Sequence, residues 1–182
     1  LGLNRPGGIV IAELHEESPF RHAGFQAGDV ILEVGGLPVN TPAEMVFRMS
    51  VAGIGKSVDV FTLLDGAQTT VPVQLIAAPE IPARATITTG QTSAIPELTL
   101  SNINPAVLGQ YGLPLGVEGV VVENSGPLGA RLGFRTGDVL IEVNGEEVET
   151  TKGAVAALAK AQRRVVIEFQ RGNQRMISRF RL

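Results

Sequence analysis

One internal repeat constrains this chain more than any other feature of its sequence. The segment 23–39, AGFQAGDVILEVGGLPV, recurs at 132–148 as LGFRTGDVLIEVNGEEV, with nine of the seventeen positions identical. The copies start 109 residues apart, which is too long for a solenoid repeat and suits one small domain plus a linker. A chain of 182 residues that is 44% hydrophobic can build two modest cores. We therefore predict two copies of one domain in tandem.

The residues around the first copy predict a small sheet with two helices. In chain order we expect a strand over 9–14, a short helix after Ser18-Pro19 and a strand over 30–34. A longer helix then begins at the capping box 41–44. The copy ends with a hairpin of strands 58–64 and 68–75, which turns at Asp65-Gly66. On the longer helix, Met45, Val46 and Met49 form the apolar stripe. We expect Phe47 to belong mostly to the core as well.

The second copy predicts the same order of elements. We expect a strand over 119–123, a short helix over 127–132, a strand over 139–143, a helix from about 151 to 162, and a hairpin of strands 165–170 and 174–182. On the longer helix, Val155, Leu158 and Ala159 share one face.

The segment between the copies, 77–94, is rich in Ala, Pro and Thr and has no periodicity. Such a composition is typical of a semi-extended linker. The expected organisation is therefore a first domain over 1–76, a linker over 77–94 and a second domain over 95–182. The fold class is α+β and mostly β, with each domain a small, mostly antiparallel sheet or partly open barrel capped by two helices.

The composition excludes several classes of function. A net charge of −3 and 4% aromatic residues argue against a nucleic-acid partner. The absence of cysteine excludes disulfides, and two histidines make a zinc site improbable, so we expect no cofactor or metal. No apolar run approaches the roughly 18 residues that cross a bilayer. Six arginines near the C-terminus favour a solvated strand face over an anionic partner site: Arg163, Arg164, Arg171, Arg175, Arg179 and Arg181.

A search for catalytic groups finds none. Ser125 lies in the sequence NSGP, which is superficially similar to the surroundings of a trypsin-like nucleophile, but the repeat places it in a loop before a short helix. A triad also needs a histidine held by an acid, and His15 and His22 belong to the other copy. Asp29 and Asp138 follow glycines at equivalent positions, where turn hydrogen bonding explains them better than acid–base chemistry. We expect this chain alone not to be an enzyme.

The repeated order of strand, short helix, GDV strand, NG turn, helix and hairpin resembles a PDZ domain of the permuted bacterial type. The resemblance covers almost the whole chain and rests on Ser18-Pro19, Ala23-Gly24-Phe25, 27–31 and Gly36 in the first copy, and on Gly133-Phe134, 137–140, 143–145 and Arg171-Gly172 in the second. Two such domains in series, the second preceded by 98–102, look like the C-terminal half of an HtrA/Deg (Do-like) serine protease.

The resemblance implies a role in periplasmic protein quality control. Its domains would bind unfolded or misfolded polypeptides by strand addition, regulate an upstream trypsin-like protease domain and control a homo-oligomer; no small-molecule substrate is implied. The implied location is the periplasm, with membrane association through upstream sequence left open. The residues implied to line the peptide grooves are Ile9, Val10, Ile11, Met45, Arg48 and Met49 in the first domain and Ile95, Leu98, Leu100, Val155 and Leu158 in the second.

The chain departs from the family pattern in both domains. It begins after the loop that would bind a peptide carboxylate and after the strand of that loop, so the edge of the strand 9–14 would be bare within the first domain. Because a bare apolar edge promotes aggregation, we predict that another segment, for example from a neighbouring molecule, covers it. In the second domain, Pro96 has no amide hydrogen and Glu97 would repel a carboxylate. A role in domain packing or oligomer assembly therefore fits the second domain better than capture of free C-termini.

Two other functions remain open at this point. The first is a scaffold or secretion-system adaptor that binds one dedicated partner and has no attached protease. The second is a regulatory insert of a membrane metalloprotease, which is disfavoured because the chain has no HExxH motif and no flanking membrane helices.

Overall fold

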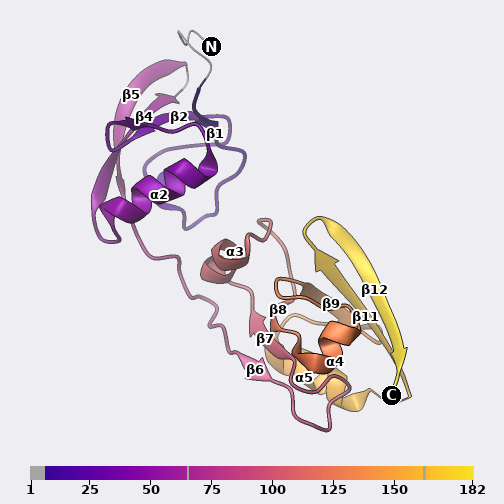
Figure 1. Ribbon diagram of the computed structural model, residues 1–182. Helices are drawn as coiled ribbons and strands as arrows, with labels where there is room; N and C mark the ends of the chain where they lie inside the picture. Colours follow the sequence, from indigo (N-terminus) through magenta and orange to yellow (C-terminus); the bar gives the residue numbers. More distant parts are fainter. Residues whose placement is uncertain (1–6, 65, 162) are drawn as a thin grey trace. The chain divides into compact units, whose positions relative to one another are not determined.

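The computed structural model describes residues 7–64, 66–161 and 163–182 and divides the chain into two compact units, Leu1–Ala77 and Ala78–Leu182 (Figure 1). The strand pairs found among these residues are antiparallel, in agreement with the predicted mostly antiparallel sheets. Asp65 of the predicted hairpin turn and Gln162 at the predicted end of the last helix lie outside the described residues.

Unit 1 is a five-stranded sheet with two helices. Its elements are β1 (Ile9–Val10), α1 (Pro19–His22), β2 (Val30–Val34), β3 (Leu37–Pro38), α2 (Pro42–Ala52), β4 (Ser57–Leu64) and β5 (Ala67–Gln74). The strand order is β1-β2-β4-β5, with β3 paired to β2. The predicted strand 9–14 is only two residues long. Ile11 nevertheless extends the pairing beyond β1, because the Ile11 amide donates a hydrogen bond to the Asp29 carbonyl over 2.9 Å.

Unit 2 is a seven-stranded sheet with three helices. Its elements are β6 (Ile87–Thr88), β7 (Thr99–Asn102), α3 (Pro105–Tyr111), β8 (Val120–Asn124), α4 (Gly126–Arg131), β9 (Val139–Val143), β10 (Glu146–Glu147), α5 (Thr151–Lys160), β11 (Arg164–Arg171) and β12 (Gln174–Arg181). The strand order is β12-β11-β9-β8-β7-β6, with β10 paired to β9.

The helix α3 is absent from the sequence-based prediction, although its end signals are present. The Asn104 side chain accepts a hydrogen bond from the Val107 amide over 2.9 Å, Pro105 follows at the first helical position, and Gly112 ends the helix in the left-handed conformation. Val107 is fully buried. Seven helical residues between prolines and glycines give too short a periodic pattern to recognise.

The two units place equivalent residues of the repeat in equivalent positions. Ile9 pairs with Ile31 in unit 1, and Val120 pairs with Leu140 in unit 2. The glycine before each of these strands has a positive φ, +102° at Gly8 and +120° at Gly119. Any Cβ at Gly8 would lie 2.8 Å from the carbonyl oxygen of Ile31, so both the conformation and the close approach require glycine here.

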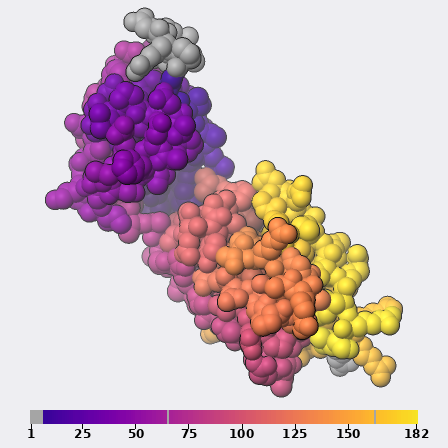
Figure 2. Space-filling model, viewed as in Figure 1, coloured from indigo at the N-terminus to yellow at the C-terminus, as the bar shows by residue number. Residues whose placement is uncertain are grey.

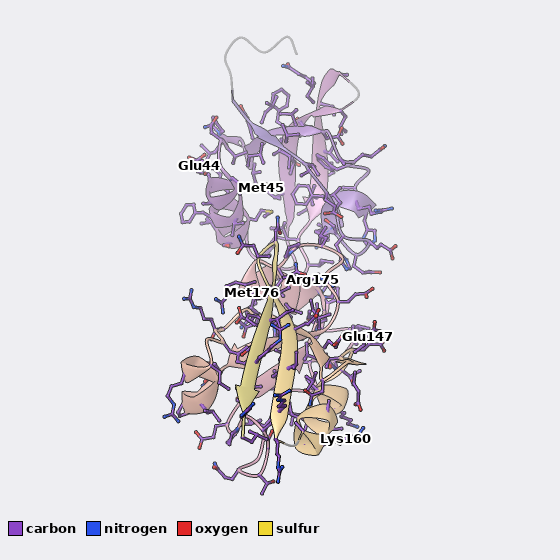
Figure 3. The ribbon with its side chains drawn as sticks, turned by 90° about the vertical axis from the view of Figure 1, so that its right-hand side faces the viewer. Glu44, Met45, Glu147, Lys160, Arg175 and Met176 are labelled. Carbon is purple, nitrogen blue, oxygen red and sulfur yellow. The ribbon has the colours of Figure 1, made fainter. Side chains whose placement is uncertain are left out.

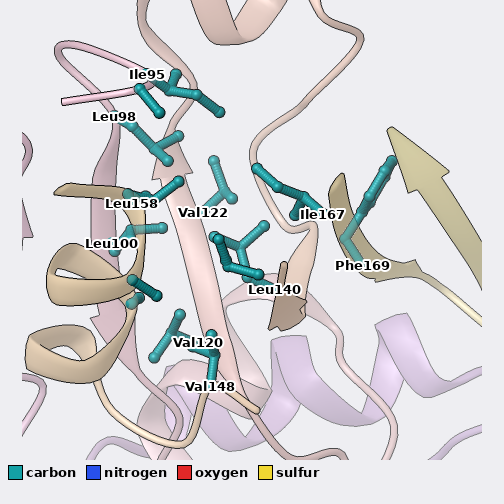
Figure 4. Packing of buried hydrophobic residues seen from close by; sticks show 14 of the residues in the cluster. Ile95, Leu98, Leu100, Val120, Val122, Leu140, Val148, Leu158, Ile167 and Phe169 are labelled. Carbon is teal, nitrogen blue, oxygen red and sulfur yellow. The ribbon is translucent and has the colours of Figure 1, made fainter. Parts of the chain in front are cut away.

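Each unit has its own core. Sixteen buried side chains form the core of unit 2, and Figure 4 shows Leu100 and Leu158 close to the β8 valines Val120 and Val122. The core of unit 1 has ten, among them Phe20 and Phe25, whose rings meet edge to face at 5.3 Å. Each unit therefore has a separate core of its own, as the repeat predicts.

The segment 78–94 differs from the free linker that its composition predicts. It contains β6, which pairs with β7, and its Ala94 is 3% exposed within the core of unit 2. The segment is rich in Thr and Ala and has no hydrophobic periodicity, so its sequence does not reveal a strand only two residues long. The pairing depends on β7, which lies further along the chain.

Candidate functional site

The site of interest in each unit lies between a sheet edge and the longer helix. The helices correspond: α2 is capped by Thr41 and α5 by Thr150, 109 positions later, and each threonine side chain accepts a hydrogen bond from the amide three residues on. Met45, Arg48 and Met49 of α2 therefore match Ala154, Ala157 and Leu158 of α5.

The matched helix faces differ in burial. On α5, Ala154 and Leu158 are fully buried and Ala157 is 6% exposed. On α2 no residue is buried; Met45, drawn on the helix in Figure 3, and Met49 only pack partly against the core. Two predictions for α2 were wrong, because Val46 is 58% and Phe47 64% exposed. On α5, Val155 is half-buried and Ala159 exposed, so Ala154 and Ala157 take the inward positions instead.

This difference follows from what lies beside each helix. The helix α5 packs against β6, β7 and β9, whereas α2 packs against β2 and β4. In unit 2, β8 is covered by β7, with Val121 opposite Ser101. Among the residues that the structure describes, β1 pairs with β2 alone. Among these residues no strand lies on the outer edge of β1, so the segment predicted to cover this edge is not found in the described part of the chain; cover by a neighbouring molecule stays a prediction.

Three predicted groove residues of unit 1, Ile9, Val10 and Ile11, lie at this open edge, and the other three lie on α2. Val10 is 62% exposed, whereas its counterpart Val121 is fully buried. Ile9 is half-buried and Ile11 is 8% exposed. Arg48 is half-exposed on α2, and its Nε atom is buried without a hydrogen-bond partner among the described residues. These residues form a strand edge, a partly apolar helix face and one cation.

The predicted groove residues of unit 2 are more buried than those of unit 1. Ile95, Leu98, Leu100 and Leu158 are all fully buried members of the core, so they are not free to contact a ligand. The sequence pattern identifies them as apolar residues of a strand and a helix, but such a pattern does not distinguish a groove wall from a core. Val155 alone keeps partial exposure.

In unit 2 the outer edge of β7 is paired with β6. The strand β6 runs antiparallel along this edge, with Ile87 opposite Leu100 and Thr88 opposite Thr99, and it also packs against α5. The Arg84 carbonyl accepts from the Asn102 amide over 2.7 Å, and the Thr151 hydroxyl donates to the Ala85 carbonyl over 2.8 Å. The segment 84–89 therefore contacts both walls of the groove.

The loop that would receive a peptide carboxylate is already engaged by Thr89. The Leu98 amide donates to Thr89 Oγ1 over 2.9 Å, and the Glu97 amide donates to the Thr89 carbonyl over 3.1 Å. The same hydroxyl donates to the Ile95 carbonyl over 2.6 Å. Pro96 has no amide hydrogen. The amides of Glu97 and Leu98 are therefore both bonded to Thr89, and the loss of carboxylate capture stays a prediction.

A polar network fixes the start of this segment. Arg84 Nε lies 3.0 Å from Glu80 Oε1, and its Nη1 lies 2.7 Å from Gln110 Oε1. The side-chain amide of Asn104 donates through Nδ2 to Glu80 Oε2 over 2.8 Å and to the Pro82 carbonyl over 2.9 Å. These bonds from Arg84 and then Asn104 lower the pKa of Glu80, and the bond to Glu80 raises the pKa of Arg84.

The two repeated aspartates behave as turn residues, as predicted. Asp29 Oδ2 accepts from the Gln26 amide over 2.7 Å, and Asp138 Oδ2 accepts from the Arg135 amide over 2.8 Å. Asp138 also binds Arg171, so that arginine belongs to the fold and not to the solvated face. Arg175, Arg179 and Arg181 are exposed on β12, whose yellow surface is visible in Figure 2.

The candidate catalytic residues fall in different units. Ser125 precedes α4 at its N-cap position in unit 2, while His15 and His22 belong to unit 1. The His15 ring accepts a hydrogen bond from the Glu17 amide, and His22 is exposed. Within 7–64, 66–161 and 163–182, no group of three metal-ligating side chains is found, and no helix is long and apolar enough to cross a membrane.

Both repeats match models of the PDZ domain, over residues 3–75 and 119–171. The chain belongs to the PDZ family, with two domains in tandem. Its relatives include a "Probable periplasmic serine endoprotease DegP-like" from Ectopseudomonas mendocina, 30% identical over 155 residues that make up 82% of this chain and 32% of the relative. A "Probable periplasmic serine protease do/HhoA-like" from Haemophilus influenzae is 26% identical over 168 residues, 91% of this chain and 34% of the relative.

These similarities confirm the predicted tandem PDZ region of the HtrA/Deg type. The chain spans about a third of the length of these curated relatives, and their names agree with the predicted periplasmic location. A solved structure, "HtrA-type protease AlgW with decapeptide", covers 84% of this chain and 54% of its own, with 13% identity and a TM-score of 0.44, a similarity too low to add to the assignment.

Proposed function

We propose that this chain is the peptide-binding and regulatory region of an HtrA-type periplasmic serine endopeptidase. In this account the parent protein carries a trypsin-like catalytic domain, and unit 1 binds extended segments of unfolded polypeptide. The peptide adds as a strand to the free edge of β1, beside α2. Unit 2 acts in packing and oligomer control.

The observation that supports this proposal most strongly is the open edge at Val10. The amide and carbonyl of Ile11 both bond toward the β2 side, to Asp29 and Gly28. Because backbone groups alternate along a strand, the amide and carbonyl of Val10 point to the opposite side. The equivalent edge in unit 2 is paired, with Ser101 of β7 opposite Val121. An unpaired edge of this kind is the surface to which an extended peptide adds.

The helix α2 supplies the side-chain wall of the proposed groove. Met45 and Met49 present flexible apolar side chains that are only partly packed, which suits varied ligand side chains. Arg48 brings a positive charge whose Nε has no partner among the described residues. This combination favours peptides with apolar residues and an acidic group or carboxylate near them.

The expected affinity is low. Four or five backbone hydrogen bonds contribute roughly 0.5–1.5 kcal/mol each, and one buried apolar side chain about 1.5–3 kcal/mol. Most of this gain is offset by the cost of association and of ordering the peptide. Binding on the order of micromolar Kd follows, and several copies in an oligomer would strengthen it.

The substitution Val10→Pro tests strand addition directly. Proline removes the outward amide of residue 10 without removing a bond to β2, whereas the control Val10→Thr keeps the amide and the β-branched shape. The probe is a twelve-residue peptide of alternating valine and threonine with N-terminal lysines, followed by fluorescence anisotropy. We expect binding to fall at least tenfold in Val10→Pro and to change little in Val10→Thr. Equal binding by both variants would overturn the proposal.

A further inference from the structure

The groove of unit 2 holds a segment of its own chain in the manner of a bound peptide. We propose that residues 84–89 are an internal ligand, and that their removal exposes a second site for an extended peptide. This inference rests on the proposed function only in assuming that peptides bind by strand addition; the edge used here is the outer edge of β7, which itself pairs with β8, the counterpart of β1. Its test is confined to unit 2 and does not depend on binding by unit 1.

The geometry of the segment matches strand addition. Ile87 lies opposite Leu100 in an antiparallel pair, and the Thr89 amide donates to the Leu98 carbonyl over 2.9 Å. At the other end, the Asn102 amide donates to the Arg84 carbonyl over 2.7 Å. An extended peptide docked between a strand edge and a helix makes the same series of backbone bonds.

Thr89 stands where a free peptide would place its last residue. It is 3% exposed, and its hydroxyl and carbonyl oxygens accept from the successive amides of Leu98 and Glu97. The two oxygens of a terminal carboxylate would accept hydrogen bonds from these two adjacent amides in the same way. The chain then continues through Gly90, so the segment enters the site as an internal stretch and not as a C-terminus.

The side chains of residues 85–88 are only weakly buried, so a free peptide can displace this segment. Ala85, Thr86 and Thr88 are exposed and Ile87 is only half-buried. Hydroxyl pairs hold Thr86 to Ser101 at 2.6 Å and Thr88 to Thr99 at 3.0 Å. The class of ligand that would replace it is an extended peptide with one β-branched apolar residue flanked by small hydroxyl residues.

The bound segment predicts that unit 2 captures free peptides poorly. A segment tethered to its own groove has an effective concentration in the millimolar range, so a free peptide competes poorly with it. Arg84 and Glu80 hold the tethered end in register through the bonds described above. Loosening the segment is therefore the step that makes the second site available.

The test compares Ile87→Pro with Thr88→Pro in the whole chain. The Thr89 amide faces β7, so by alternation the Ile87 amide also faces β7 and the Thr88 amide faces away. Only Ile87→Pro therefore removes a bond to β7. The probe is a synthetic peptide of residues 82–90, PARATITTG, added to labelled protein and followed by amide chemical shifts at Leu100 and Asn102.

We expect Ile87→Pro to bind this peptide at least about 100-fold more tightly than the unmodified chain or Thr88→Pro. Core amides of Leu140 and Ile167 should stay protected from hydrogen exchange, which shows that unit 2 remains folded. A folded Ile87→Pro variant that does not bind the peptide overturns the proposal.

If Ile87→Pro unfolds, a second measurement tests whether residues 84–89 are an internal ligand. A specific protease site is placed in the exposed loop at Gln91 and the chain is cut there. We expect the two fragments to remain associated at micromolar concentration and to dissociate when excess 82–90 peptide is added. Fragments that separate on cleavage without peptide, or that stay together in its excess, contradict an internal ligand.

Discussion

Arg171 Nε lies 2.7 Å from Oδ1 of Asp138, and Arg171 Nη2 lies 2.7 Å from Oδ2 of the same carboxylate. Asp138 is 1% exposed, so this two-point contact compensates a charge that has left water. The same arginine donates to the Gly133 carbonyl and stacks over the Phe169 ring. It thereby ties the GDV turn of unit 2 to the end of β11.

We expect Arg171→Ala to destabilise unit 2 by about 2 to 4 kcal/mol, because it leaves the Asp138 carboxylate buried with only the Arg135 amide as partner. The matched control is Arg175→Ala on the neighbouring strand, where an exposed side chain should change stability by less than about 0.5 kcal/mol. Calorimetry of the whole chain would show the shift in one of its two transitions. Equal, small shifts in both variants would show that the contact contributes little.

The Glu80–Arg84 contact predicts a pH dependence at low pH. Because the pKa of Glu80 is lowered from its ordinary value of 4.5, its contacts stabilise the folded unit above about pH 4.5 and are lost as the pH falls through the folded-state pKa. In Arg84→Gln the pKa of Glu80 should rise toward its ordinary value. Carbon-13 NMR titration of the Glu80 carboxyl measures both, with Lys160→Gln as a control that leaves the pKa unchanged. An unaltered titration in Arg84→Gln would contradict this assignment.

The glycine before β8 predicts a sharp difference between two substitutions. In Gly119→Ala the new Cβ overlaps the carbonyl oxygen of Leu140, whereas at Gly133 nothing lies within 4 Å. Both glycines have positive φ, so each substitution costs about 1 to 2 kcal/mol from the backbone conformation alone. We expect Gly119→Ala to cost about 1 to 3 kcal/mol more than Gly133→Ala in urea unfolding. Similar costs for the two would show that the strand relaxes freely around residue 119.

Much of the fold could be predicted because the repeat carries strong local signals. The GDV strands, the capping threonines and the glycine turns act within a few residues, so the sequence reveals them. The partners of β6 could not be predicted in this way, because a two-residue strand has no periodicity and its pairing depends on β7. The helix α3 was missed for a similar reason, since its seven residues are too few for a pattern.

The candidate site could be predicted only in part. Met45 and Met49 lie on the face of α2 that packs partly against the core, as the apolar stripe predicts, whereas Val10 lies at an edge that none of the described residues covers, although a covering segment was expected. Leu98, Leu100 and Leu158 look the same in sequence but are buried in the core of unit 2. The helices α2 and α5 differ in burial because β6 and β7 pack beside α5, whereas α2 packs against β2 and β4. The apolar pattern of one helix does not show which strands pack beside it.

Hydrogen exchange at Val10 and Asn102, with and without saturating valine–threonine peptide, tests the central claim most directly. The outward amide of Val10 should exchange rapidly in the free protein and slow markedly when peptide adds to β1. The Asn102 amide, already bonded to Arg84, should be protected in both states. Slowed exchange confined to unit 2, or a Val10 amide that peptide leaves unchanged, would contradict the account.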